Sequence, residues 1–335
     1  MLRAITRIAN RWSITTVKTL MSLLIKGGPS ALFTPWFWSI QKQITNSTHH
    51  RDYPSLPEPE INDSSIAEVK VLFIGHIHFP EFVDRFVRGA AQLRQTNWKF
   101  VVTSSNPQIL EKVNALRQSE GLQRVYTMLV ANRGRNISPF IQAMKEHGHD
   151  GDVVIHIHSK RSEHAKGKDV ESWVNSQWNL LFDDSDLVKR IVSVFIAHPR
   201  VSIAYPAVQS MLSPWTYTWS SNARRARKLL LPLGIEVRAS ERIAFPAGAM
   251  FAARVKDLLF LEKLKLEPED FPEEAGQLDG ELQHVVERLF GFVPERTGGL
   301  HAIYLSSSDS FTTETRAVTD NLQYLDFPSQ PGQTR

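Results

Sequence analysis

The sequence predicts an α/β fold: a Rossmann-related, mostly parallel sheet with helices on both faces. From Val69 onward, short apolar runs of strand length alternate with segments that have helical spacing. The apolar runs are continuous rather than interrupted by polar residues, which is typical of parallel strands buried on both faces. Ligands of such sheets bind at the loops that follow the carboxyl ends of the strands, so we expect the functional residues there.

Each expected element follows from its own pattern. The first run, VKVLFIGH, contains Gly75 and is followed by Pro80, and the next segment places Phe82, Phe86 and Ala90 at helical spacing. The same reasoning predicts strands at 69–76, 98–103, 125–130, 153–158, 201–205 and 247–253. It predicts helices at 81–93, 107–119, 137–146, 173–199 with a break near 183–185, 222–230, 256–264 and 280–290.

Composition limits the class of protein. The chain has 335 residues, of which 42% are hydrophobic and 22% charged, which suits one large domain with appendages. It contains no cysteine, which excludes disulfides and thiolate metal sites. It has no run of about eighteen apolar residues, so no membrane-spanning helix is predicted.

Residues 1–50 contain no Asp or Glu, and Arg3, Arg7 and Arg11 share one helical face opposite Trp12. A basic amphipathic segment of this kind can lie in a membrane interface. An organellar transit peptide and a basic helix packed on its own domain fit the same pattern. We expect four parts: a basic amphipathic segment 1–43, a polar linker 44–67, a folded domain 68–305 and a flexible C-terminal tail 306–335.

A basic loop, Asn132-Arg133-Gly134-Arg135-Asn136, directly follows one expected strand and precedes a helix. Gly134 permits close approach of a ligand to the backbone, and the two arginines offer forked donors suited to a diphosphate. Asn136 is a plausible cap for the helix, whose N-terminus is a ready anion site. A solvated basic turn is the alternative interpretation.

The next expected strand ends in His156-Ile157-His158-Ser159-Lys160. Alternation places both histidines and Lys160 on one side of the sheet. Two histidines at this spacing can ligate a metal, but no third histidine or carboxylate is adjacent, so a cation cluster for a diphosphate fits better. Histidines satisfied by backbone carbonyls are the alternative. The D-x-D sequence at 150–152 precedes the strand, so it is predicted at the opposite end of the sheet.

The segment 273–284 leads into the last expected helix and carries three candidate bases. Glu274, Asp279 and His284 could each deprotonate an acceptor hydroxyl. In the alternative interpretation Asp279 caps the helix, Glu274 lies in solvent, and His284 pairs with Arg288 or the core.

Together these stretches resemble the rhamnan synthesis F family and, more distantly, the inverting GT-A glycosyltransferases. Family members carry N-x-G-R-D-x-x-P-F, then H-x-K-K-S after an apolar strand, then G-[ST]-M-F-W-x-R, and last F-x-x-E-x-G-Q-x-D-G-T-x-x-H-x-x-E-R. Here the four motifs begin, in this order, at Asn132, His158, Gly248 and Phe271. The chain departs from them with Asn136 for Asp, Arg161 for Lys, Ala249 for Ser or Thr, Ala252 for Trp and Glu281 for Thr.

The resemblance implies a GT-A-like enzyme that moves a deoxyhexose, L-rhamnose, from a dTDP donor to a lipid-linked cell-surface polysaccharide. Asp279 is the expected general base, with Glu274 and His284 as further candidates. The expected nucleotide-sugar contacts are Asn132, Gly134, Arg135, Asn136, His158 and Lys160. The expected acceptor contacts are Gly248, Met250, Phe251 and Gln277.

The resemblance also implies a reaction without a metal cofactor. His158 and Lys160 occupy the place where GT-A enzymes carry the metal-binding D-x-D. Lys160, Arg135 and His158 are therefore expected to neutralise the leaving diphosphate.

These expectations place the protein in the cytoplasm, peripherally on the inner face of the cell membrane. The alternative is a non-catalytic binding or assembly subunit of polysaccharide biosynthesis. The basic stretch 224–228 would suit nucleic acid, but the folded body is nearly charge-balanced and no RNA or DNA module is visible. No nucleic-acid partner is therefore expected.

Overall fold

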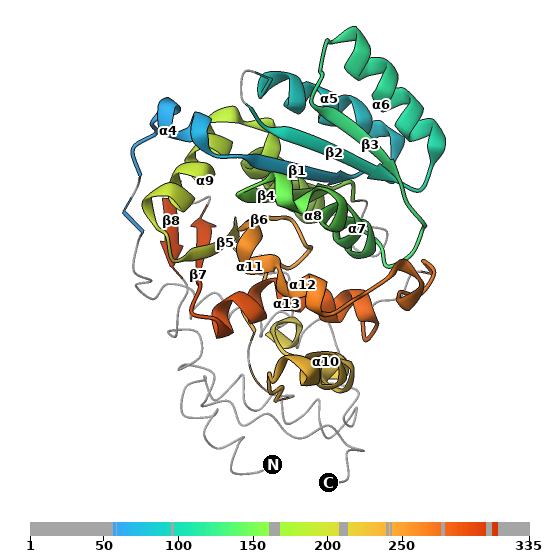
Figure 1. Ribbon diagram of the computed structural model, residues 1–335, viewed down its shortest axis with the longest axis vertical. Helices are drawn as coiled ribbons and strands as arrows, with labels where there is room; N and C mark the ends of the chain where they lie inside the picture. The colour runs from blue at the N-terminus through green and yellow to red at the C-terminus, as the bar shows by residue number, and fades with distance from the viewer. Residues whose placement is uncertain are drawn as a thin grey trace, which may run out of the picture. The chain divides into compact units, whose positions relative to one another are not determined.

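The computed structural model describes residues 56–57, 59–94, 97–160, 168–207, 214–238, 241, 243–275, 279–305 and 310–313. A compact unit formed by Tyr53–Gln209 and Tyr217–Thr315 contains one eight-stranded sheet with its helices (Figure 1). The predicted basic segment 1–43 and most of the predicted linker and tail lie outside the described residues.

The sheet is mostly parallel, as predicted. Its strands lie in the order β3-β2-β1-β4-β6-β5-β7-β8. Strand β1 pairs in parallel with β2 and β4, β2 with β3, and β5 with β7, whereas β6 is antiparallel to β4 and β5, and β8 to β7. The bounds are β1 Val71–His76, β2 Lys99–Ser104, β3 Val125–Leu129, β4 Val153–His158, β5 Val201–Pro206, β6 Phe251–Arg254, β7 Leu300–Leu305 and β8 Ser310–Thr313.

One face of the sheet packs against the helices α5, α6 and α9 and the end of α8. Phe73 of β1 meets Trp98 and Phe182 there, with ring centroids 5.7 and 5.4 Å apart. The predicted break near 183–185 is confirmed as a π-helical turn, η4, which ends before Asp184 caps α9. The bounds are α5 Val83–Gln92, α6 Pro107–Ser119, α8 Lys168–Trp178, η4 Asn179–Asp183 and α9 Ser185–Ala197.

The opposite face packs against α7 (Ile137–His147) and α13 (Leu282–Arg296). Phe140 of α7, Phe251 of β6 and Phe290 of α13 form an aromatic cluster with centroids 4.7 to 5.6 Å apart. Helices therefore cover both faces, which confirms the predicted layers (Figure 1). The shorter helices are α4 Asp63–Glu68, α10 Ala223–Leu230, α11 Val255–Leu258 and α12 Phe260–Lys263. The 3-10 turns are η2 Pro80–Phe82, η3 Gly148–Asp150, η5 Pro214–Tyr217, η6 Ser220–Asn222, η7 Leu231–Leu233 and η8 Pro268–Asp270.

Some boundaries differ from the expectations. The helix α4 begins within the predicted linker at Asp63 and ends at Glu68, because the Asn62 side chain accepts hydrogen bonds from the backbone of Ser64 and Ser65. Four residues of the predicted tail form β8, which pairs with β7. The strand expected at 247–253 is shorter and starts at Phe251, because Gly248 and Ala249 adopt positive φ angles of 90° and 55° that no strand accommodates.

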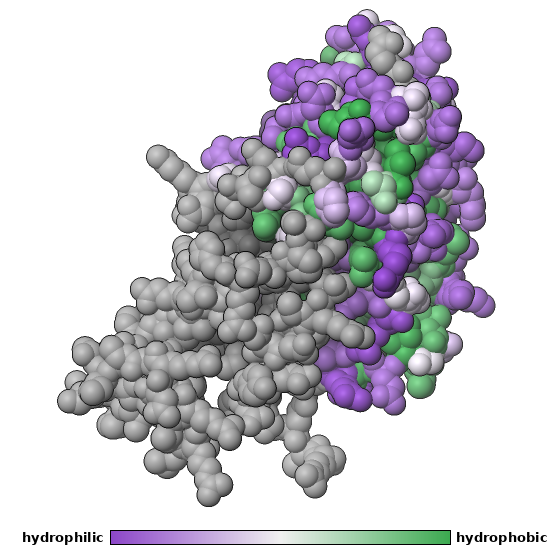
Figure 2. All heavy atoms as spheres, turned by 90° about the vertical axis from the view of Figure 1, so that its left-hand side faces the viewer, coloured by the Kyte–Doolittle hydropathy of each residue, from purple (hydrophilic) through white to green (hydrophobic). Residues whose placement is uncertain are grey.

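Hydrophilic side chains cover most of the described surface in the view of Figure 2, with smaller hydrophobic areas between them. This is the ordinary surface of a water-exposed α/β domain. Among the described residues, no helix is both long enough and apolar enough to cross a bilayer.

Buried histidines line the face of the sheet that α7 covers. His76 of β1 and His158 of β4 are register partners, and His156 lies two residues earlier on the same face. His156 is fully buried against the Phe140 ring, with centroids 4.5 Å apart. Burial lowers the pKa of His76 to about 3 and that of His158 to about 4, and the nearby Lys160 lowers the pKa of His158 further. These side chains are therefore neutral at pH 7.

The helix α13 depends on a glycine at its centre. A Cβ atom at Gly291 would lie 1.9 Å from the carbonyl oxygen of Ala244 and 2.8 Å from Cα of Phe245. Both atoms belong to backbone, which cannot rotate away as a side chain can. We expect Gly291→Ala to reduce the free energy of unfolding by about 3 kcal/mol, at the upper end of overpacking costs, measured by urea unfolding.

Gly121→Asn is the matched control for this substitution. Gly121 has φ +66° and no atom within 4 Å of a built Cβ, and Asn tolerates this backbone conformation. Equal loss of stability in the two variants would contradict the close contact at Gly291.

We expect the free energy of unfolding to fall as the pH is lowered from 6.5 to about 4. In this window the unfolded chain takes up protons on His158 and His301, whose pKa burial lowers from 6.5 to about 4 in the folded state. Each such histidine contributes a slope of up to about 1.4 kcal/mol per pH unit. Urea unfolding at a series of pH values measures this slope.

His301→Gln is expected to reduce the slope, whereas substitution of the exposed His149 should leave it unchanged, since its side chain is 75% accessible. A slope that is insensitive to His301→Gln would show that this histidine is not held neutral in the fold.

Candidate active site

The candidate site lies at the carboxyl end of β4, where it meets the loop 132–136 and the first turns of α13. The backbone turn at Gly248 forms the floor of this site. The Nε2 atom of His158 donates to the Gly248 carbonyl oxygen over 2.7 Å, and the Gly248 N–H donates to Oε1 of Glu287 over 2.7 Å. A Cβ atom at 248 would lie 3.1 Å from the Trp173 ring. The turn therefore connects β4, α8 and α13.

Lys160 lies two residues after His158, just beyond the end of β4. Its Nζ atom lies 4.2 Å from the centroid of the Trp173 ring. Burial lowers the pKa of Lys160, Glu287 raises it, and Arg135 lowers it further. Lys160 is thus a cation held between an aromatic face and a carboxylate, with a second cation nearby.

The loop 132–136 is attached to the segment that precedes α13. The Gly134 N–H donates to the Pro272 carbonyl oxygen over 3.1 Å, and Arg133 and Glu273 form an antiparallel bridge. Gly134 has φ +63°, and a Cβ atom there would lie 2.6 Å from the Phe271 ring. A glycine is therefore needed at position 134 for two reasons: its positive φ angle, and the close packing of the loop 132–136 against Phe271.

The Arg135 side chain contacts the same segment before α13 through Glu274. It has a φ of 56°, and its Nε atom lies 3.2 Å from Oε2 of Glu274. The side chains of Arg135 and Glu274 are 38% and 28% exposed. Glu274 is thus the counter-charge of Arg135 and is not the solvated carboxylate of the alternative interpretation.

Asp279 accepts hydrogen bonds from two side chains that precede α10. Ser221 Oγ donates to Oδ2 and Asn222 Nδ2 donates to Oδ1, each over 2.9 Å, and Arg288 lies 3.5 Å from Oδ1. Burial raises the pKa of Asp279, but Arg288 and these hydrogen bonds outweigh it and hold the pKa below its usual range. Asp279 is therefore ionised at neutral pH, as a proton acceptor must be.

Asp279 does not cap α13. The residue before the helix is Glu281, whose N–H donates to Nδ1 of His284 over 3.2 Å. Nδ1 is thus the unprotonated nitrogen of His284, and Nε2 carries the proton. Nε2 is buried and makes no hydrogen bond within the described structure. Burial lowers the pKa of His284, which Glu287 and Asp279 partly offset.

Several predicted contacts are placed differently. Met250 and Phe251 are completely buried, Met250 in the core and Phe251 against Phe140, so neither lines the site. His158 is neutral, because its pKa is about 4, so it adds no positive charge for a diphosphate. Asn136 makes no side-chain capping bond, since its backbone is already helical, with φ −82° and ψ −14°.

Six of the other predicted residues lie together around the start of α13: Arg135, Lys160, Gly248, Glu274, Asp279 and His284. Asn132 contacts this group through its backbone, because its carbonyl oxygen accepts a hydrogen bond from the Glu274 N–H over 3.4 Å. Gln277 lies outside the described residues.

Sequence reasoning missed two residues of this site, Glu287 and Trp173. Glu287 lies one helical turn after His284, so the two share a face of α13. That spacing was present in the last family motif and could have identified Glu287. Trp173 lies in a different helix and no local pattern connects it to Lys160.

No group of three His, Asp or Glu side chains that could hold a metal ion occurs within the described ranges. The D-x-D sequence at 150–152 lies at the amino end of β4, as predicted. There Asp150 pairs with Lys99 over 2.7 Å, and Asp152 accepts a hydrogen bond from the Lys70 N–H over 3.0 Å. Both carboxylates have structural partners.

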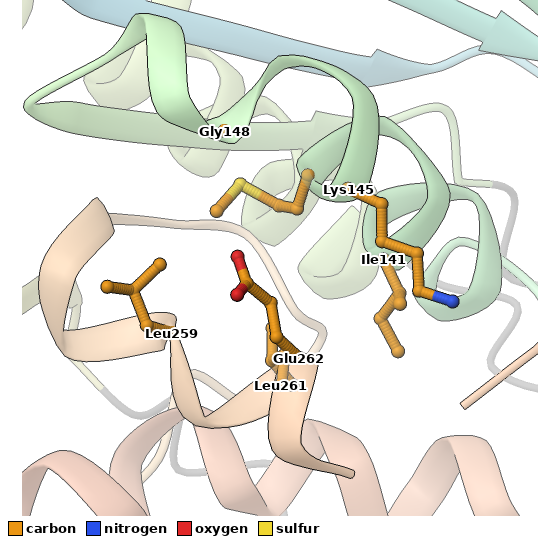
Figure 3. Close-up of a pocket in the computed structure, with 7 residues that line it drawn as sticks. Ile141, Lys145, Gly148, Leu259, Leu261 and Glu262 are labelled. Atoms are coloured by element: carbon orange, nitrogen blue, oxygen red, sulfur yellow. The ribbon is translucent and has the colours of Figure 1, made fainter. Parts of the chain in front are cut away.

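A small pocket lies at the other end of α7, away from this site (Figure 3). Ile141 and Lys145 of α7 face Leu259, Leu261 and Glu262 across it. Its volume of about 10 Å³ is far below the roughly 300 Å³ at which ligand pockets begin. The pocket is therefore a packing gap between α7 and α12.

Comparisons with solved structures give matches of low identity. A mannosyltransferase, PcManGT from Pyrobaculum calidifontis in complex with GDP-Man and Mn²⁺, is 12% identical, with a TM-score of 0.45 over 81% of this chain and 63% of that one. TarS 1–349 from S. aureus is 13% identical, with a TM-score of 0.38 over 72% of this chain and 59% of that one.

Sequence comparisons are more specific. The protein WxcX of Xanthomonas campestris pv. campestris, in strains B100 and ATCC 33913, is 28% identical over 219 residues. The match covers 65% of this chain but only 30% of the relative. The sequence also matches the family described as Rhamnan synthesis protein F over residues 45–298, a range that includes all four motifs and the whole candidate site. This range exceeds half of the chain, and the protein therefore belongs to the rhamnan synthesis protein F family.

Proposed function

We propose that this protein is a glycosyltransferase that transfers a sugar from a nucleotide-sugar donor to a growing cell-surface polysaccharide. The observation that carries the proposal is the convergence of two cations at the carboxyl end of β4. Lys160 lies over the Trp173 ring, which packs on Gly248, and Arg135 pairs with Glu274 in the segment before α13. A bound diphosphate would compete with the neighbouring carboxylates for these two cations. Membership of a polysaccharide-synthesis family supports the same conclusion.

In the proposed reaction, an acceptor hydroxyl attacks the anomeric carbon of the donor sugar. The bond between that carbon and the diphosphate oxygen breaks, and the negative charge that develops on the diphosphate is stabilised by Arg135 and Lys160. Asp279 takes the proton of the attacking hydroxyl as general base. Its two existing hydrogen bonds, from Ser221 and Asn222, fix the orientation of the carboxylate and leave lone pairs for the acceptor.

The proposed sugar is L-rhamnose, carried by a dTDP donor, and the proposed acceptor is a lipid-linked glycan. Support for rhamnose comes from the family, whose description names rhamnan synthesis. A lipid-linked acceptor would bring the protein to the inner face of the cell membrane.

The proposed reaction proceeds without a metal ion. Support comes from the carboxyl end of β4, where Lys160 provides a positive charge and His158 is committed to the Gly248 carbonyl oxygen. Retained transfer in excess chelator would support this part of the proposal. Complete loss in chelator, restored by Mn²⁺ or Mg²⁺, would overturn it while leaving the transferase assignment intact.

A non-catalytic assembly subunit is the second candidate. The observation in its favour is that Asp279 has three polar neighbours, Ser221, Asn222 and Arg288, and could serve to hold α10 against α13. The second candidate predicts that donor binding and transfer are both absent.

We expect Lys160→Met to weaken donor binding by about 10- to 100-fold, the loss typical of one charge-assisted contact. Calorimetry with dTDP-rhamnose, UDP-sugars and GDP-sugars would measure the dissociation constants. Lys145→Met is the matched control, because Lys145 pairs with Glu267 at the far end of α7. Failure of every donor to bind the wild-type protein would favour the assembly subunit.

We expect Asp279→Asn to reduce kcat by a factor of about 10² to 10⁴, the range for loss of a general base, while donor affinity stays within a few-fold of the wild type. Ser221→Ala removes one hydrogen bond to the same carboxylate but keeps its charge, so it should lower kcat far less. Equal effects of the two substitutions would indicate that Asp279 has a structural role only.

A further inference from the structure

The helix α10 presents an outward face that has no partner in the described structure. Its inner face is formed by Ala223, Ala226 and Leu230, which are buried. The exposed positions include Arg224, Arg227 and Lys228, and the exposed Leu231 follows one turn later in helical backbone conformation. Positions 224, 227, 228 and 231 recur at helical spacing, so they lie on one face.

The charge on this face is not neutralised. Within the described residues, Arg225 pairs with Glu281, but no carboxylate pairs with Arg224, Arg227 or Lys228. Arg227 donates through Nε to the Val237 carbonyl oxygen and keeps its charge. Three cations on an eight-residue helix therefore face outward together.

An apolar side chain projects from the same face. Leu231 is 77% exposed, the highest value among the large hydrophobic residues of the described structure. Exposure of a leucine side chain to water is unfavourable. Leu231 lies next to the three cationic residues of this face. In interfacial helices, arginine and lysine side chains bind anionic lipid headgroups while apolar side chains beside them enter the membrane surface. Leu231 and the cations of α10 have this arrangement.

We propose that this face of α10, defined by Arg224, Arg227, Lys228 and Leu231, docks on an anionic lipid bilayer. The three cations would contact lipid phosphates and Leu231 would enter the headgroup–acyl boundary. Nucleic acid would also attract the cations, but it offers no apolar phase for Leu231, so the bilayer is favoured. This inference does not depend on the transferase proposal, because membrane docking requires no donor.

The position of α10 connects this surface to the candidate site. Figure 1 shows α10 on the side of α13 that faces away from the sheet. Ser221 and Asn222, which hold Asp279, immediately precede α10, and Arg225 donates to the Gly280 carbonyl oxygen over 2.9 Å. A bilayer on this face would thus lie along the helix whose preceding residues hold Asp279.

The 335-residue sequence contains no cysteine, so a single probe can be placed without other changes. We would label Leu231→Cys in the 335-residue chain with an environment-sensitive fluorophore. Vesicles of phosphatidylcholine with phosphatidylglycerol should shift its emission to the blue, whereas pure phosphatidylcholine vesicles should not. Leu129→Cys is the matched control, since Leu129 is 60% exposed and lies on β3. Its emission should not change.

The charge requirement is tested in the same labelled protein. Each cation near an anionic surface contributes about fivefold in affinity, so Arg224→Ala with Lys228→Ala should weaken vesicle binding about 25-fold. Arg88→Ala with Arg94→Ala removes the same charge from exposed positions at the end of α5 and should have little effect. Added salt should reverse the shift at position 231.

Three outcomes would overturn the proposal. The first is the absence of a shift at position 231 with anionic vesicles, including the case in which another segment binds them. The second is an equal shift at positions 231 and 129. The third is a response of the probe to single-stranded RNA but not to vesicles, which would assign the face to nucleic acid.

Discussion

The candidate site depends on two hydrogen bonds to the backbone of Gly248. His158, at the end of β4, donates to its carbonyl oxygen, and Glu287, in α13, accepts its N–H. A side chain is disfavoured here, because φ is +90° and a Cβ atom would lie only 3.1 Å from the Trp173 ring. Lys160 lies two residues beyond His158, and His284 one turn before Glu287, so both take their positions from this contact.

Every cation at the site faces a carboxylate. Arg135 pairs with Glu274, Arg288 with Asp279, and Lys160 lies near Glu287. Such pairs hold the charged groups in place before a ligand arrives, at the cost of desolvating them. A diphosphate would therefore compete with Glu274 and Glu287 for the same cations. In the proposed mechanism the two glutamates act as counter-charges, and Asp279, which Ser221 and Asn222 orient beside Arg288, is the general base.

The helix α10 connects the candidate site to the proposed docking surface. Its amino end holds Asp279 through Ser221 and Asn222, and its carboxyl end exposes Leu231 beside unpaired cations. The proposed lipid-binding surface and the proposed general base are thus joined by one short helix. For an acceptor carried by a membrane lipid, this arrangement would replace diffusion in solution with a fixed approach to the site.

The sequence by itself predicted the strands β1 to β6 and most of the helices, but not β7 or β8, and it placed the candidate site at the carboxyl end of β4. It could do so because apolar runs and helical spacing are local, and because alternation decides which side of a strand His156 and His158 occupy. Only the tertiary structure decided which side chains contact one another at that edge. Gly134 is needed because the Phe271 ring packs against it, and Glu287 belongs to the site because it accepts the Gly248 N–H. Met250 and Phe251 are buried because helices cover both faces of the sheet around β6. These contacts join distant segments, and local periodicity carries no record of which segments pack together.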